Sequence, residues 1–274
     1  MKIAFCFLTR GDLLQPNVWN AFFAAAPPER YSVYCHPKDP AAVVSPLLRD
    51  GIIPRCVETR HGHASLVQAT VNLFAHACET DADVAYCILL SESTVPIVPF
   101  AAIHDALARL QPRSLVPYQV PPPGTEHHGR LAAVRHGERF ASAFFQHDQW
   151  IVLHRRHVVL LREAPALDLF ANMFAPDEHY FMNVLIHMQG APLGEFVNRR
   201  TSFVNWRERE VRTYTDRASG RFIGRTVHPK TYRSLPAEEI AAARNQGCWF
   251  FRKIDAACDC TALLPSLESR LAAS

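Results

Sequence analysis

Short apolar runs, bounded by charged, glycine or proline positions, recur through the first third of the chain. Residues 3–8, 31–35 and 84–90 have the length and the boundaries of buried β-strands. Between the second and third runs, apolar residues recur at helical intervals and predict a helix from Ala64 to Cys78. This alternation of strand and helix predicts an α/β fold, a mainly parallel twisted sheet with helices on both faces.

The same pattern continues, less regularly, through the rest of the chain. A helix is expected to begin at Pro99, and Val120-Pro121-Pro122-Pro123-Gly124 is the clearest loop, because proline cannot donate a ladder hydrogen bond. We expect this loop to face the acceptor. The remaining predicted elements are strands over 114–118, 149–153 and 248–251 and helices over 157–162, 176–188 and 236–244.

Composition narrows the class of protein. With 274 residues, 49% of them hydrophobic, the chain can bury one large core or two small ones. The formal charge of +3 is too small to indicate a nucleic-acid surface. No apolar run approaches the roughly 20 residues that a membrane span requires. We therefore expect no nucleic acid among its partners, no membrane span and a soluble chain.

Cysteine and histidine are plentiful, but their spacing is not that of a metal site. Cys6, Cys35 and Cys87 lie in strand-like runs, where a free thiol packs as a small hydrophobe, and this favours a reducing compartment. Cys248, Cys258 and Cys260 could form a bridge or hold a metal, but one residue separates the last two instead of two or more. None of the 14 histidines forms an i, i+4 pair around a carboxylate, so loop histidines are favoured.

Polar residues follow several predicted strands directly, where parallel-sheet proteins bind their ligands. These segments are Thr9-Arg10-Gly11, His36-Pro37-Lys38, Ser91-Glu92-Ser93 and Arg252-Lys253. Their hydroxyls, carboxylate and cations suit a sugar joined to phosphates, although each segment alone is more often ordinary surface. Asp81-Ala82-Asp83 matches the Asp-x-Asp motif with which nucleotide-sugar enzymes bind a divalent ion. It precedes the predicted strand over residues 84–90, however, so it is expected at the opposite edge of the sheet, as a solvated turn.

Two further groups could carry chemistry. Pro176-Asp177-Glu178-His179 opens an apolar helix, and Glu178 in its first turn could remove a proton from a sugar hydroxyl; otherwise the two acids only stabilise the helix dipole. Without a metal, Lys230 and Lys253 could compensate the negative charge that develops on a leaving diphosphate. The alternative is that both are solvated surface lysines. Trp19, Trp150, Trp206 and Trp249 offer indole faces for a sugar, with core packing as the alternative.

In their order along the chain, the motifs resemble the core-2/I-branching family of glycosyltransferases, particularly its plant relatives. The matching segments cover about the first 255 residues, and the ordered set of motifs is far more specific than any single motif in it. They are residues 3–11, 19–23, 31–37, 63–67, 89–96, 149–150, 155–157, 176–180, 203–206, 228–232 and 251–253.

The resemblance implies a metal-free, GT-A-like fold and an inverting transfer, typically of N-acetylglucosamine from its UDP donor to a glycan hydroxyl. In a sister branch xylose is moved to a protein serine. Glu178 would be the base, and Lys230 and Lys253 would hold the diphosphate. The remaining donor-site residues would be Thr9, Arg10, Gly11, His36, Ser65, Ser91, Glu92 and Arg252, and the acceptor site would include Trp150, Trp206 and Asp177.

We accordingly predict one catalytic domain that needs no cofactor or divalent metal. Residues 1–118 would bind the nucleotide sugar, 119–255 would bind the acceptor and carry the base, and 256–274 would form a tail. The predicted compartment is the cytoplasm, with the Golgi lumen as the alternative if an N-terminal anchor has been removed. Two rival hypotheses are a non-catalytic glycan or nucleotide-sugar binding protein and a metal-dependent hydrolase built on the histidine pairs.

Overall fold

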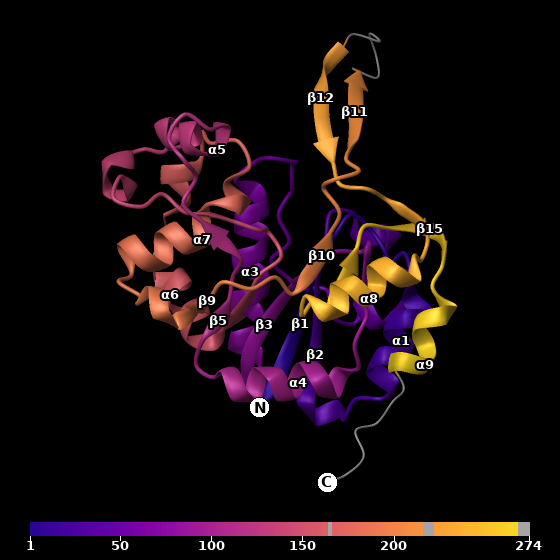
Figure 1. Cartoon of the computed structure of the whole chain (residues 1–274). Helices are drawn as coiled ribbons and strands as arrows, with labels where there is room; N and C mark the ends of the chain where they lie inside the picture. The colour runs from indigo at the N-terminus through magenta and orange to yellow at the C-terminus, as the bar shows by residue number, and fades with distance from the viewer. Residues whose placement is uncertain (164–165, 216–221, 268–274) are drawn as a thin grey trace.

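The structure, a computed structural model, describes residues 1–163, 166–215 and 222–267. Its centre is a six-stranded sheet (Figure 1). The strands lie in the order β2 (Tyr31–Pro37), β1 (Lys2–Thr9), β3 (Val84–Leu90), β8 (Val152–His154), β5 (Ser114–Leu115) and β9 (Phe196–Val197). β1 runs parallel to both of its neighbours and β5 runs parallel to β9, whereas β8 is antiparallel to β3 and β5. The predicted α/β class with a mainly parallel sheet is confirmed.

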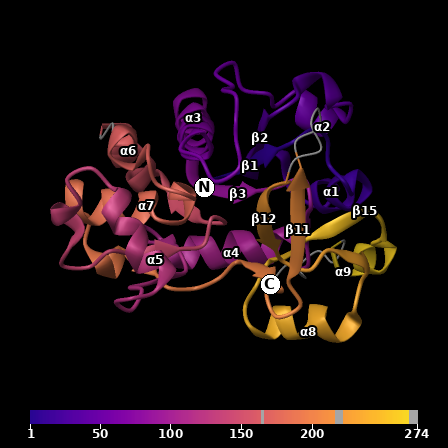
Figure 2. The ribbon, with the colours of Figure 1, turned by 90° about the horizontal axis from the view of Figure 1, so that it is seen from above.

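Helices cover both faces of this sheet, as Figures 1 and 2 show. Successive side chains of β1 point to opposite faces. Phe5 and Phe7 pack in the core shared with α1 (Pro16–Ala24) and α4 (Phe100–Leu110), while Ala4 and Cys6 pack in the core shared with α3 (Ser65–Thr80) and α6 (Arg155–Glu163). Because both faces are buried, the strand reads as a continuous apolar run and not as an alternating one.

A second, three-stranded sheet joins segments that are far apart in sequence. It contains β10 (Ser202–Val204), β14 (Phe250–Arg252) and β4 (Thr94–Pro96), in that order. β14 is antiparallel to β4, and the Ile254 amide donates to the Ser93 carbonyl at 2.9 Å. These contacts place β14 and the start of β15 (Ile254–Asp259) beside the loop that follows β3.

A hairpin of β11 (Glu210–Thr215) and β12 (Phe222–His228) projects from the body of the protein in Figure 1. Sequence patterning did not predict it, because its strands carry no apolar run. Two more short pairs complete the strands of the described residues: β6 (Tyr118–Gln119) with β7 (Gln146–His147), and β13 (Tyr232–Ser234) with β15 (Ile254–Asp259).

Several predicted elements differ from those observed. The expected helix over 176–188 is a 3-10 turn (Pro176–Glu178), a short α7 (Tyr180–Asn183) and a π-turn (Val184–Met188), because His179 has a φ of −138°, outside the helical region. The expected strand over 114–118 divides into β5 and β6 at Pro117. The predicted strands over 149–153 and 248–251 are shifted to β8 and β14. The predicted helices over 157–162 and 236–244 match α6 and α8 (Ala237–Asn245).

The other short α-helices of the described residues are α2 (Pro46–Arg49), α5 (Glu126–Gly129) and α9 (Leu264–Leu267). The predicted tail over 256–274 lies outside these residues beyond Leu267. All eight cysteines are free thiols. In the described ranges, no helix combines the length and the apolar character needed to cross a bilayer. Those ranges also hold no cluster of three potential metal-binding side chains.

Candidate active site

A cleft of about 420 Å³ opens at the carboxyl ends of β1, β2 and β3. Thr9 ends β1 and Arg10 follows it, Lys38 follows β2, and the Ser91–Ser93 loop follows β3. The three-stranded sheet adds Arg252 and Lys253 from the end of β14. Most of the strand-end residues predicted from the sequence therefore share one cavity.

Glu178 also lines the cleft, and it lies in the 3-10 turn that begins at Pro176. This turn is tied to the loop that carries His61, because the Ala175 amide donates to the Gly62 carbonyl at 2.9 Å. Ala175 has a φ of +50°, a left-handed conformation that alanine seldom adopts. The Glu178 side chain is 33% exposed, so its carboxylate can meet a substrate in the cleft.

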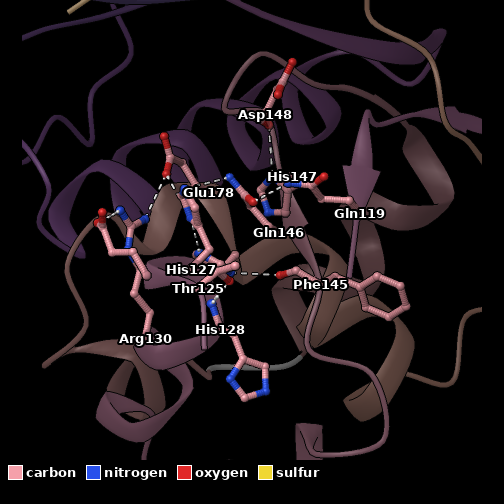
Figure 3. A network of polar contacts seen from close by, with 12 residues as sticks. Gln119, Thr125, His127, His128, Arg130, Phe145, Gln146, His147, Asp148 and Glu178 are labelled. Carbon is pink, nitrogen blue, oxygen red and sulfur yellow. Dashed lines mark hydrogen bonds and ion pairs between the residues drawn. The ribbon is translucent and has the colours of Figure 1, made fainter. Parts of the chain in front are cut away.

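The polar contacts of the Glu178 carboxylate with the described residues are all made by one of its two oxygens, Oε2. Oε2 accepts from Arg130 Nη1 at 2.9 Å, and His127 Nδ1 lies 4.0 Å from the same atom. Figure 3 shows these side chains converging on the carboxylate. Sequence reasoning missed Arg130, which is 48 residues away along the chain and begins a 3-10 turn directly after α5 (Glu126–Gly129).

Asp177, beside Glu178, also lines the cleft but is only 6% exposed. Its Oδ1 is buried without a hydrogen-bond partner among the described residues. Burial, and then the charge of Glu178, raises the pKa of Asp177 to about 7.

The cleft is also lined by the cations Arg10 and Lys253. His61 lines it, and the pKa of this imidazole is lowered by partial burial and then by Arg10, with a smaller effect of Lys253, while Glu178 opposes the shift. His61 therefore lies within electrostatic range of the carboxylate and of both cations. Arg252 adds a third positive charge.

Arg252 is held by stacking. Its guanidinium lies 4.1 Å from the centre of the Trp150 ring. Burial lowers the pKa of Arg252 to about 10, and the negative charges of Glu92 and Asp148 oppose that shift. Ser91 and Glu92 also line the cleft. One face of Trp150 is thus occupied by a cation and is not available to a sugar.

Lys230 does not line the cleft. Its Nζ lies 2.9 Å from Glu208 Oε2 and 3.5 Å from Glu239 Oε1, and 4.8 Å from the centre of the Tyr232 ring. Its neighbours His228 and Pro229 line the cleft instead. The predicted leaving-group role of Lys230 stays a prediction, and it requires the lysine to leave two glutamates.

His36, Ser65 and Gly11 also lie outside the lining. His36 is fully buried and its Nε2 accepts from the Val57 amide at 2.9 Å, while Ser65 Oγ accepts from the Arg60 amide at 3.0 Å. Both side chains hold the loop that presents His61. The Gly11 carbonyl accepts from Thr9 Oγ1 at 2.7 Å and fixes the end of β1. Their predicted contact with the nucleotide stays a prediction.

The tryptophans divide into two groups. Trp150 and Trp206 line the cleft, and Trp206 is 48% exposed at its mouth. Trp19 and Trp249 are buried in the core. An exposed indole beside a polar cleft is suited to stacking on the apolar face of a sugar.

The Asp81-Ala82-Asp83 motif lies at the amino end of the sheet. Lys2 Nζ lies 2.6 Å from Asp81 Oδ2, and the Lys2 amide donates to the Asp83 carbonyl. Since Lys2 begins β1, the motif is at the edge opposite the cleft, as predicted.

The sequence model of the Core-2/I-Branching enzyme family matches residues 3–245. The chain belongs to the Core-2/I-Branching enzyme family. Among curated proteins it is 24% identical, over 200 residues, to glycosyltransferase BC10 of Oryza sativa subsp. japonica. The match covers 71% of this chain and 45% of the rice protein, so this family member spans less than half of that relative's length.

Among solved structures, the chain is similar to a mannose-1-phosphate geranyltransferase from Thermus thermophilus. The identity is 11%, the TM-score is 0.30, and the alignment covers 66% of this chain and 71% of the other. The assignment to the Core-2/I-Branching family therefore depends on the sequence match, and the fold class on the strand order described above.

Proposed function

We propose that this chain is an inverting glycosyltransferase that moves a sugar from a UDP-sugar to a hydroxyl group of a glycan or protein. N-acetylglucosamine is the first donor sugar to test, and xylose is the alternative from the same family. The observation that supports this proposal best is one cleft that Glu178 lines together with Arg10 and Lys253. A base and a cationic site for a diphosphate are the two groups that such a transfer requires.

In the proposed step, Glu178 accepts the proton of the acceptor hydroxyl while the acceptor oxygen attacks the anomeric carbon. The bond between that carbon and the diphosphate oxygen breaks, and UDP leaves with the electron pair. Lys253, Arg10 and Arg252 would stabilise the charge that develops on the diphosphate. A single displacement inverts the configuration at the anomeric carbon.

We propose that these cations do the work of a divalent ion. Lys230 remains a further candidate, because exchange of Glu208 and Glu239 for a diphosphate would direct its ammonium to the leaving group. Activity is then expected to survive EDTA. Loss of activity in EDTA and its return with manganese would contradict the metal-free part of the proposal.

The acceptor would enter beside Trp206, whose exposed ring lies at the mouth of the cleft. We propose that Asp177, which also lines the cleft, binds an acceptor or donor hydroxyl. The proposed partners are thus the nucleotide-sugar donor and a glycan or glycoprotein acceptor. The cytoplasm, or alternatively the Golgi lumen, stays a prediction.

The test is UDP release from a panel of UDP-N-acetylglucosamine, UDP-xylose, UDP-galactose and UDP-glucose, with and without candidate acceptors. Glu178→Gln is expected to abolish turnover and to leave UDP binding nearly unchanged by calorimetry, because the amide keeps the shape but cannot accept the proton. Glu29→Gln, at an exposed position in another part of the chain, is the matched control. Wild-type protein that binds UDP-sugars but turns over none of them would favour the non-catalytic binding protein.

A further inference from the structure

Arg130 is almost enclosed although it carries a charge. Its side chain is 11% exposed. Nη1 donates to Glu178 Oε2 at 2.9 Å, Nη2 donates to Glu126 Oε1 at 2.8 Å, and the guanidinium lies 5.3 Å from the centre of the Phe174 ring. A buried guanidinium is costly unless charged groups pair with it. Of the two carboxylates that pair with Arg130, Glu178 is the less exposed, with 33% of its side chain exposed against 77% for Glu126.

A second side chain approaches the same oxygen of Glu178. His127 Nδ1 lies 4.0 Å from Oε2 and 3.4 Å from His179 Nε2, and His127 Nε2 lies 3.1 Å from Gln146 Nε2 (Figure 3). Burial, and then the charge of Arg130, lowers the pKa of His127. The imidazole is therefore mainly neutral near pH 7, and Arg130 is the charged partner of the carboxylate.

These contacts use Oε2 and leave Oε1 without a hydrogen bond to the described residues. We infer that Arg130 is a positioning residue that holds Glu178 by one oxygen and directs the other toward the acceptor hydroxyl. This inference rests on the proposed role of Glu178 as the base. A glutamate has three side-chain torsions, and without the guanidinium its carboxylate would sample orientations in which no oxygen meets the hydroxyl.

The test uses water as the acceptor, so that no glycan needs to be identified. UDP-N-acetylglucosamine is incubated with wild-type protein and with Arg130→Met and Arg130→Lys, and UDP is measured as it is released. For Arg130→Met we expect kcat to fall about 100-fold with little change in KM, since misplacement of a catalytic group by about 1 Å can cost that much. Arg130→Lys should recover part of the loss, and added methylguanidinium should raise the rate of Arg130→Met.

Glu126→Gln is the matched control, because it removes the exposed carboxylate from the same guanidinium and leaves the bond to Glu178. It should keep the wild-type kcat. Thermal melting of each variant checks that the fold is intact. Crystal structures provide a readout that does not depend on turnover: Glu178 should occupy one conformation in the wild type and several in Arg130→Met.

Two results would overturn the inference. A higher KM with unchanged kcat in Arg130→Met would make Arg130 a substrate contact, and a single, unchanged Glu178 conformation in its crystal structure would show that the guanidinium is not needed to place the carboxylate. Failure of the proposed function has a different signature, because Glu178→Gln would then hydrolyse the donor as fast as the wild type. If no donor is hydrolysed at all, the crystal structures still decide the positioning role.

Discussion

Replacing Asp177 with asparagine should make folding stability depend less steeply on pH. Burial and the neighbouring Glu178 raise the pKa of this carboxyl group from 3.8 to about 7. Below pH 3.8 the group is protonated in the folded and unfolded states alike. Between 3.8 and about 7 the unfolded chain releases this proton and the folded protein keeps it, so the group lowers stability progressively as the pH rises.

The magnitude follows from these two pKa values. Each pKa unit corresponds to about 1.4 kcal/mol, and integrating the linkage from pH 5 to pH 8 gives a loss of about 2 to 3 kcal/mol from Asp177 alone. His147 and His179 act in the opposite direction, because burial lowers their pKa values to about 4 and about 3. Their effect is common to both proteins and cancels in the difference between wild type and variant.

The assay is urea unfolding of wild type and Asp177→Asn at pH 5 and pH 8, followed by circular dichroism. The stability of the variant relative to the wild type should rise by about 2 to 3 kcal/mol between the two pH values. In a Glu178→Gln background the same substitution should give a smaller change, since the charge of Glu178 contributes to the shift. Equal pH dependence of the wild type and Asp177→Asn would refute the reasoning.

Three further substitutions test the walls of the cleft. Gly62→Ala would place a Cβ 2.4 Å from the Phe174 ring and should lower both the melting temperature and turnover. Gly124→Ala is the control, because Gly124 also has a positive φ but its added Cβ would meet nothing within 4 Å, and it should have the smaller effect. Equal effects of the two substitutions would exclude the clash as the cause. Trp150→Leu removes the ring beneath Arg252 and should weaken UDP binding by about tenfold in calorimetry, and unchanged affinity would contradict that support. Trp206→Ala should raise the acceptor KM and leave donor hydrolysis unchanged; slower hydrolysis would instead place the indole at the donor.

Local patterns in the sequence were sufficient to predict much of the fold. Buried strands and amphipathic helices have periodicities of 2 and 3.6 residues, and the apolar runs alone predicted β1, β2 and β3. The carboxyl-edge rule then led to Thr9, Arg10 and Glu92, because parallel strands end at one edge of their sheet. The hairpin of β11 and β12 was missed, since its strands contain no run of apolar residues that would mark them.

The sequence by itself determined β1, β2 and β3, the sheet edge at which a ligand is expected and the acid that could serve as a base. Only the tertiary structure decided which groups surround that acid. Arg130 meets Glu178 across 48 residues, β14 brings Arg252 beside Glu92, and Lys230 pairs with two glutamates outside the cleft. Periodicity reports how a residue is oriented within its own element, whereas the partners of a charged side chain depend on the path of loops that carry no such pattern.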